Sequence, residues 1–280
     1  MKKICRKSFL ISIAAASFLT AACTSVPRAE NQDEFVYKDA GGGYHVAKIN
    51  PDVPQFQYER ALFKKKGQKM TYLDNEKYSY KLGIDISRHE GLIDWKKVRE
   101  AGIEFVFIRI GWRGYQTGIL HTDENFHQNI TGALEAGLQV GVYLFSQAIN
   151  EEEALEEAEL VIRELEGYEI TLPVVFDPES VGWEEARTDD VEGEQFTKNT
   201  IVFCNRVKEA GYEPMIYSNL IWETEFFDLN RLCEYKIWYA DYEKRPQTPY
   251  HFEFWQYGGL SRRVPGIKRK VDADIWLIQN

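Results

Sequence analysis

Two carboxylates placed two residues apart are the part of this sequence best suited to chemistry. Asp177 and Glu179 follow the apolar run 172–176. If that run is a strand, alternate side chains share a face, and the two α-carbons lie roughly 6.5–7 Å apart. Acids this close cannot both ionise freely, so one of them keeps its proton to a higher pH than usual. A protonated acid beside a carboxylate is the pair that hydrolysis of a glycosidic bond requires.

Further acids and aromatic residues stand at the ends of other apolar runs. Asp85 belongs to the run 82–87, and Asp272 lies at the start of the run 271–277. We expect these two acids to join the first pair in a set that contains no basic residue. Aromatic faces suit the apolar faces of sugar rings. We therefore expect substrate to be bound by six residues near the remaining strand ends, namely Tyr143, Tyr217, Trp238, Asp241, Trp255 and Gln256.

Other hydrolytic chemistries lack their motifs in this chain. The sequence contains neither Gly-x-Ser-x-Gly nor His-Glu-x-x-His, which argues against acyl transfer and zinc hydrolysis. We therefore expect no metal site and no other cofactor.

A regular alternation of strand-like and helix-like segments must position these residues. Short apolar runs rich in β-branched residues alternate with amphipathic segments that end at glycine, as a left-handed helix cap requires. Five such units predict a parallel sheet covered by helices. The predicted strands are 82–87, 105–110, 139–145, 172–176 and 214–218, and the predicted helices are 94–101, 124–136, 151–165 and 194–210.

The C-terminal part departs from this alternation. Three more strands, 235–242, 252–257 and 271–277, are separated by loops too short for full helices. Eight strands in all indicate a barrel whose last part lacks helices. The site of such a barrel lies at the C-terminal ends of its strands, where the acids and aromatic residues above are found.

Five sequence blocks resemble, in order, the motifs of the glycoside hydrolase family 25 lysozymes. The match runs from Lys81 to the C-terminus. The blocks are Gly83-Ile-Asp-Ile-Ser-Arg-His-Glu-Gly-Leu-Ile-Asp-Trp95, Val174-Val-Phe-Asp-Pro-Glu179, Ile237-Trp-Tyr-Ala-Asp-Tyr242, Trp255-Gln-Tyr257 and Val271-Asp272.

The resemblance implies a fold and an activity. The fold would be an α/β, flattened (β/α)5(β)3 TIM-like barrel. The activity would be that of a lysozyme, an N-acetylmuramidase that cleaves the β-1,4 bond from N-acetylmuramic acid to N-acetylglucosamine in peptidoglycan. By resemblance, Glu179 is the general acid/base and Asp177 assists the 2-acetamido group of the substrate, with net retention. Asp85 and Asp272 correspond to two further acids of the cleft, and the intermediate is either an oxazolinium ion or a covalent ester.

Two positions depart from the family pattern. Pro178 stands between the paired acids, where an apolar or aromatic residue is common, and Asp274 stands where asparagine is expected. Neither change removes a carboxylate from the set.

The first residues indicate export. A cationic start and an apolar stretch make residues 1–22 a signal peptide, and Leu19-Thr20-Ala21-Ala22-Cys23 resembles a lipoprotein cleavage site. Lipidation of Cys23 would anchor the protein in the cell envelope; the alternative is ordinary cleavage after Ala22 and secretion. We interpret residues 23–78 as a tether and irregular extension, and residues 79–280 as the catalytic barrel. Cys204 and Cys233 are either a disulfide or free thiols.

The charge balance excludes a nucleic-acid partner. The chain has 34 basic and 44 acidic residues, for a net charge of −10, and no long basic run. An acidic surface predicts that activity on acidic walls rises with moderate salt, and that any polyanionic substrate is met locally. We expect a monomer that acts on peptidoglycan glycan strands.

Two other functions remain open. One is a catalytically silent peptidoglycan-binding module on the same barrel, although such a module has no reason to keep all four acids. The other is hydrolysis of another acetamido-sugar polymer such as chitin. Only the final Asp-x-Glu of the usual chitinase strand motif is present, in Asp177-Pro178-Glu179.

Overall fold

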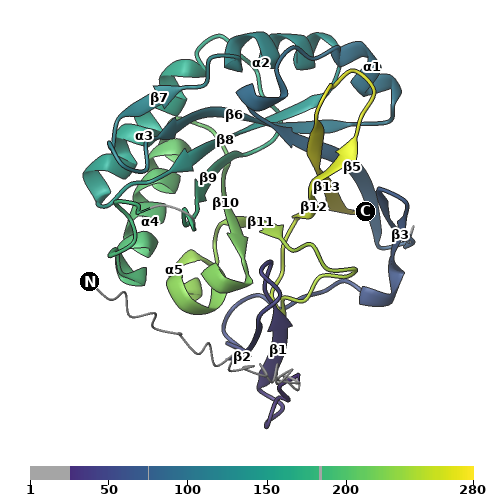
Figure 1. The fold of residues 1–280 in the computed structure, drawn as a ribbon, viewed down its shortest axis with the longest axis vertical. Coiled ribbons are helices and arrows are strands. Elements are labelled where there is room, and N and C mark those ends of the chain that lie inside the picture. Colours follow the sequence, from purple (N-terminus) through teal and green to yellow (C-terminus); the bar gives the residue numbers. More distant parts are fainter. Residues whose placement is uncertain (1–25, 75, 183–184) are drawn as a thin grey trace, which may run out of the picture.

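Eight strands close into a barrel in the computed structural model, which describes residues 26–74, 76–182 and 185–280 (Figure 1). These strands are β5 (Tyr78–Ile86), β6 (Phe105–Arg113), β8 (Gln139–Ser146), β9 (Val174–Pro178), β10 (Pro214–Asn219), β11 (Lys236–Ala240), β12 (Phe254–Arg263) and β13 (Lys270–Gln279). The first seven are parallel to their neighbours, and β13 is antiparallel to both β12 and β5. Pairing of β5 with β6 closes the ring, and a short strand, β7 (Leu120–Thr122), flanks β6. The chain therefore has a mixed α/β fold.

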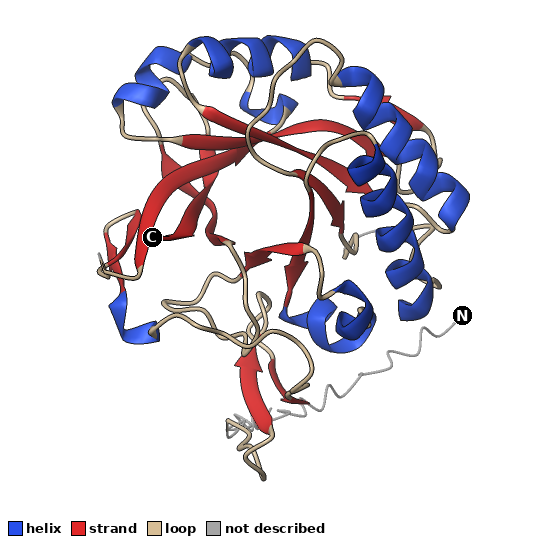
Figure 2. Ribbon diagram, turned by 180° about the vertical axis from the view of Figure 1, so that it is seen from behind, coloured by secondary structure: helices blue, strands red, loops and turns tan. Residues whose placement is uncertain are grey.

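Helices lie outside the ring of strands and cover only part of it (Figure 2). Gly102, Gly137 and Gly211 follow three of them with φ of 83°, 75° and 91°, which confirms the predicted glycine ends. The predicted elements of this region are confirmed apart from shifts at their ends. The helices are α1 (Trp95–Glu100), α2 (Phe126–Glu135), α3 (Glu151–Glu164), α4 (Gly193–Glu209) and α5 (Leu229–Leu232), with single turns η2 (Arg88–Glu90) and η3 (Trp222–Phe226).

Alternation along each strand fills the barrel with side chains. Phe105 and Phe107 of β6 point inward and pack with Trp238 and Phe254, and the Phe107 and Trp238 rings stack 4.6 Å apart. Gly83 leaves room for this packing, since a β-carbon there would lie 2.3 Å from the Phe105 ring. The interior of the barrel is therefore filled with packed side chains, and functional side chains are confined to the end of the barrel.

The segment before the barrel is more regular than predicted. It forms two hairpins, β1 (Glu34–Lys38) with β2 (Tyr44–Lys48) and β3 (Phe63–Lys66) with β4 (Lys69–Tyr72), and a turn η1 (Arg60–Leu62). Both hairpins lie beside the barrel on the side away from α1 to α4 (Figure 1). Their strands are too short for a clear sequence pattern. Long-range aromatic packing orders them, and it joins Tyr37, Tyr58, Phe63, Tyr72, Trp255 and Tyr257 in one buried cluster.

Cys204 and Cys233 do not form a disulfide. Cys204 is buried, Cys233 is exposed, and both are free thiols. The predicted signal peptide, residues 1–22, and the predicted lipidation site Cys23 lie outside the residues that the structure describes. Within those residues, no helix combines the length and apolar character needed to cross a bilayer.

Candidate active site

A cavity of about 1110 Å³ lies at the C-terminal ends of the parallel barrel strands. Asp272 reaches this end because β13 is antiparallel to β5, which pairs Asp272 with Asp85. Eight of the predicted site residues line the cavity together: Asp85, Tyr143, Asp177, Glu179, Tyr217, Trp238, Gln256 and Asp272.

The pKa values of the two closely spaced acids, Asp177 and Glu179, are both raised. Burial raises the pKa of Glu179 to about 7, with help from the nearby charge of Asp272 and opposed by a hydrogen bond with Tyr217. Burial and the charge of Glu179 also raise the pKa of Asp177 well above its usual value. The two carboxyls titrate as a pair, so the site keeps a proton near neutral pH and can act as an acid.

The backbone of Glu179 is fixed by a buried glutamine. Gln147, 1% exposed, donates from Nε2 to the Glu179 carbonyl oxygen at 2.6 Å. Thr188 in turn donates its hydroxyl to Gln147 Oε1 at 2.9 Å, which sets the orientation of the amide. Glu179 follows β9 directly, so this contact holds the main chain in place just after Pro178.

The opposite wall of the cavity holds Asp85 in a hydrogen-bonded chain. The hydroxyls of Tyr217 and Tyr242 both donate to Gln256 Oε1 at 2.9 Å, and Gln256 Nε2 donates to Asp85 Oδ2 at 2.9 Å. Burial and the neighbouring charges of Asp272 and Asp274 raise the pKa of Asp85, and the bond from Gln256 opposes this rise.

The surroundings of Asp274 explain how an aspartate can stand where the family pattern has asparagine. It is fully buried and accepts a hydrogen bond from Trp238 Nε1 at 2.9 Å through Oδ1. Burial raises the pKa of Asp274 to about 8, with the charge of Asp272 adding to the effect. A carboxyl that stays protonated at neutral pH is uncharged, as the asparagine expected from the resemblance would be.

Arg109 was missed by the sequence analysis, which expected no basic residue in the site. It projects from β6 into the cavity, and its Nε donates to Asp123 Oδ2 at 2.9 Å. Its charge lowers the pKa of Asp177 and so partly offsets burial. A single arginine inside the apolar run 105–110 was the signal that could have identified it.

A basic hairpin forms one rim of the cavity and was also missed. The end of β12, the turn and the start of β13 contribute Arg263, Lys268, Arg269 and Lys270 to the lining. The chain is acidic overall, so this is a local concentration of positive charge beside the carboxylates.

The prediction that Trp255 binds substrate is wrong. Trp255 is 0% exposed, packs edge-on against Phe63 and donates from Nε1 to the Asp241 carbonyl oxygen at 2.8 Å. Trp255 and Gln256 are neighbours on one strand, so their side chains point to opposite faces. Gln256 faces the cavity, and Trp255 therefore faces the extension.

Asp241 lies beside the main cavity instead of in it. It lines an adjoining cavity of about 710 Å³. Its carboxylate accepts hydrogen bonds from the Tyr239 hydroxyl at 2.8 Å and from the Gln247 backbone nitrogen at 2.9 Å. Asp241 therefore orders the wall of this second space.

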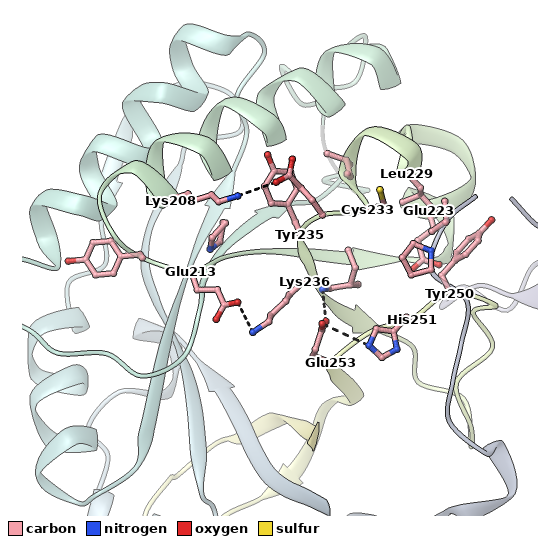
Figure 3. Close-up of a pocket in the computed structure, with 17 residues that line it drawn as sticks. Lys208, Glu213, Glu223, Leu229, Cys233, Tyr235, Lys236, Tyr250, His251 and Glu253 are labelled. Atoms are coloured by element: carbon pink, nitrogen blue, oxygen red, sulfur yellow. Dashed lines mark hydrogen bonds and ion pairs between the residues drawn. The ribbon is translucent and has the colours of Figure 1, made fainter. Parts of the chain in front are cut away.

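A further cavity, of about 430 Å³, lies at the opposite end of the barrel, where β10 and β11 begin (Figure 3). Two of its acids are paired with lysines, Glu213 with Lys236 at 2.6 Å and Glu234 with Lys208 at 3.1 Å. None of the described residues predicted for the site lines this cavity, so we place the chemistry at the other end of the barrel.

Two relatives match 69% of this chain in sequence. The "Autolytic lysozyme" of Clostridium acetobutylicum is 26% identical over 196 residues, which cover 69% of this chain and 54% of that protein. This chain therefore spans about half the length of that relative. The "Uncharacterized protein YegX" of Escherichia coli K12 is 29% identical over 206 residues, which cover 69% of this chain and 68% of that protein.

Solved structures share the fold. The bacterial lysozyme of Streptomyces coelicolor superposes with a TM-score of 0.57 at 25% identity, over 70% of this chain and 91% of that one. The modular autolysin LytC of Streptococcus pneumoniae has a TM-score of 0.61 at 24% identity, over 90% of this chain and 58% of that one. Residues 84–267 match the model for glycosyl hydrolases family 25, which is well over half of the chain. The chain therefore belongs to glycosyl hydrolases family 25.

Proposed function

We propose that this protein is a lysozyme that hydrolyses the β-1,4 bond between N-acetylmuramic acid and N-acetylglucosamine in bacterial peptidoglycan. The observation that carries the proposal is the pairing of Asp177 and Glu179 in one cavity, with the pKa of both raised. Family membership and the lysozymes among its relatives support the same activity. We also propose the (β/α)5(β)3 description for the barrel.

We propose roles for the four acids on the basis of the family resemblance and their shared cavity. Glu179 protonates the glycosidic oxygen as the bond to the leaving sugar breaks, and it later removes a proton from the attacking water. Asp177 assists the acetamido group of the substrate in displacing that sugar, which gives net retention at the anomeric carbon. Asp85 and Asp272 line the cleft and stabilise positive charge that develops on the sugar ring.

Product analysis of purified peptidoglycan tests this proposal. Borohydride reduction of the products identifies the sugar at each new reducing end, and we expect reduced muramic acid. Proton NMR of the first products should show the β-anomer before mutarotation. Reduced glucosamine would identify a glucosaminidase, faster cleavage of chitin oligomers would favour another acetamido-sugar polymer, and binding without new ends would favour a silent module.

We further propose that the protein is exported as a monomer and anchored to the cell envelope through lipidated Cys23. The sequence of residues 19–23 supports the anchor, and the wall substrate of the family supports export. Fractionation of cells that express the full chain or Cys23→Ser tests it. We expect Cys23→Ser to leave the membrane fraction; retention of both proteins in that fraction would contradict the anchor.

A further inference from the structure

The hairpin of β1 and β2 forms one wall of the 710 Å³ cavity beside the active site. Its tip contributes Asp39, Ala40, Gly41 and Gly42 to the lining. The hairpin precedes residues 84–267, so it lies outside the part of the chain that matches the family. Across the cavity, the barrel contributes residues from the ends of β10 and β11, which are Asn219, Leu220, Ala240, Asp241 and Tyr242.

The two cavities meet at the proposed acid. Glu179, Tyr217 and Tyr242 line both of them. An enzyme that cleaves inside a polymer must hold sugars on both sides of the broken bond. A proton donor at the junction of two cavities satisfies this requirement, with one part of the glycan in each.

The hairpin is fixed to the barrel by reciprocal contacts. The Lys38 backbone nitrogen donates to Gln247 Oε1 at 2.8 Å, and Gln247 Nε2 donates to the Lys38 carbonyl oxygen at 2.9 Å. Lys38 Nζ pairs with Glu243 at 2.9 Å, and the Tyr37 hydroxyl bonds Thr224 Oγ1 at 2.8 Å. A wall held this way is formed before a ligand arrives, so binding pays little ordering cost.

The tip of the hairpin is ordered by its own aspartate. Asp39 Oδ1 accepts the Gly43 amide at 2.8 Å, and Asp39 Oδ2 bonds His45 Nε2 at 2.7 Å. The main chain closes the turn with Asp39 N donating to Gly43 O at 2.9 Å. Ala40 and its glycine neighbours therefore hold a set position over the cavity.

The chemistry of the cavity favours an uncharged sugar. Among the described residues that line the cavity, Lys38 is the one cation and Glu243 neutralises it, whereas Asp39 and Asp241 add negative charge. A carboxylate or phosphate would be repelled there. Tyr242 is 47% exposed with its hydroxyl held by Gln256, so its ring offers a flat surface at the junction.

We propose that the β1 and β2 hairpin builds a saccharide subsite that extends the glycan cleft beyond Glu179. This inference rests on the proposed function, because it assigns the second cavity to the same glycan strand. It also gives the segment before the barrel a role in substrate length preference.

A blocking substitution in the full chain tests the subsite. Ala40→Trp puts an indole into the cavity from an exposed position, and Val46→Trp puts the same side chain on the same hairpin outside the cavity. We expect Ala40→Trp to raise KM for peptide-free glycan octasaccharide about tenfold while kcat changes little. Val46→Trp should leave both constants unchanged. Equal KM for Ala40→Trp and wild type would overturn the subsite.

A binding measurement separates this inference from the proposed function. Calorimetry of the Glu179→Gln chain, with and without Ala40→Trp, compares a peptide-free glycan disaccharide with the octasaccharide. We expect Ala40→Trp to weaken octasaccharide binding and to leave disaccharide binding unchanged. That result supports the subsite even if the wild type cleaves no peptidoglycan, in which case only the proposed function fails. An octasaccharide affinity that is unchanged by Ala40→Trp would contradict the subsite.

Discussion

Gln256 donates a hydrogen bond from Nε2 to Asp85 Oδ2 at 2.9 Å, and it can do so in one amide orientation only. Its Oε1 is occupied by the hydroxyls of Tyr217 and Tyr242, so the amide nitrogen must face the aspartate. The glutamine therefore connects the tyrosines that border both cavities to an acid of the cleft.

Replacing this glutamine should disturb Asp85 directly and the proposed acid pair only through Tyr217. In Gln256→Ala the bond that lowers the pKa of Asp85 is lost, so that pKa rises further and the acidic limb of kcat/KM moves to higher pH. Activity should fall about tenfold, because buried groups left unpaired cost about 1–3 kcal/mol. Gln279→Ala, at an exposed glutamine of β13, is the control. An unchanged acidic limb would refute the role of Gln256.

Asp274 should be replaceable by asparagine. Below pH 8 both side chains are neutral, so Asp274→Asn should keep nearly full activity. Because the folded-state pKa of Asp274 is raised, its stabilising contribution is complete below the unfolded value and is lost as pH rises through about 8. The wild type should therefore lose more thermal stability than Asp274→Asn as the pH rises from about 4 to about 8, and the difference should level off above that.

The control for this position is Asp274→Leu. It leaves Trp238 Nε1 without an acceptor, so it should be destabilised at every pH by about 1–3 kcal/mol. Melting curves of the wild type and Asp274→Asn that fall in parallel with pH would show that Asp274 does not titrate in this range.

The response to salt should be the reverse of the one expected from net charge. Net charge predicts repulsion from acidic walls, but the basic hairpin places cations at the mouth of the cleft, where substrate enters. Activity on intact walls should therefore fall as salt is added, since ionic strength of about 0.1 M screens beyond about 10 Å. The double variant Lys268→Gln/Lys270→Gln should be less active than the wild type at low salt, and its activity should depend less on salt concentration.

A variant with the same change in charge controls for that experiment. Lys208→Gln/Lys236→Gln removes two cations at the other end of the barrel and should leave the salt profile as in the wild type. If both double variants respond to salt alike, the hairpin has no local effect.

A buried ion pair should dominate the attachment of α3 to β6. Arg113 is 3% exposed and donates from Nε to Glu157 Oε1 at 2.8 Å, and Glu157 is 0% exposed. Arg113→Met leaves a buried carboxylate alone and should cost about 3–5 kcal/mol of unfolding free energy. Arg113→Met/Glu157→Leu should recover most of that loss in urea unfolding.

The ion pair between Arg113 and Glu157 also determines how the stability of Arg113→Met depends on pH. The pKa of Glu157 is about 7, because burial outweighs Arg113, so without the arginine the loss should grow as pH rises above 7. Arg163→Met, at an exposed arginine of the same helix, should change stability by less than about 0.5 kcal/mol. An equal effect of Arg113→Met and Arg163→Met would exclude the buried pair as an anchor.

The sequence predicted the barrel well because its strands are short apolar runs with marked ends. Asp85 and Asp177 could be placed at one end of the barrel because parallel strands share that end. Asp272 stands at the start of its strand and reaches the same end because β13 is antiparallel to β5. The face of the strand on which a side chain lies is harder to predict. Trp255 and Gln256 are neighbours, and only the structure shows which of them points into the cavity.

Long-range packing accounts for the rest. The β1 and β2 hairpin is ordered by residues such as Gln247, about two hundred positions away, which no local pattern reveals. The cations between Arg262 and Lys270 are visible in the sequence, but their position at the cleft depends on how β12 and β13 pair. Arg109 lies within a predicted strand, and only its place in the cavity lining and its contact with Asp123 identify it as part of the site.

A pH profile of the wild type and of Glu179→Gln tests whether Glu179 is the acid of a muramidase. Release of reducing ends from purified peptidoglycan should fall as pH rises above about 7 in the wild type, because Glu179 loses its proton. Glu179→Gln should be at least about a hundredfold slower below that pH and should lack the limb. Equal release by the two proteins across this range would contradict the account.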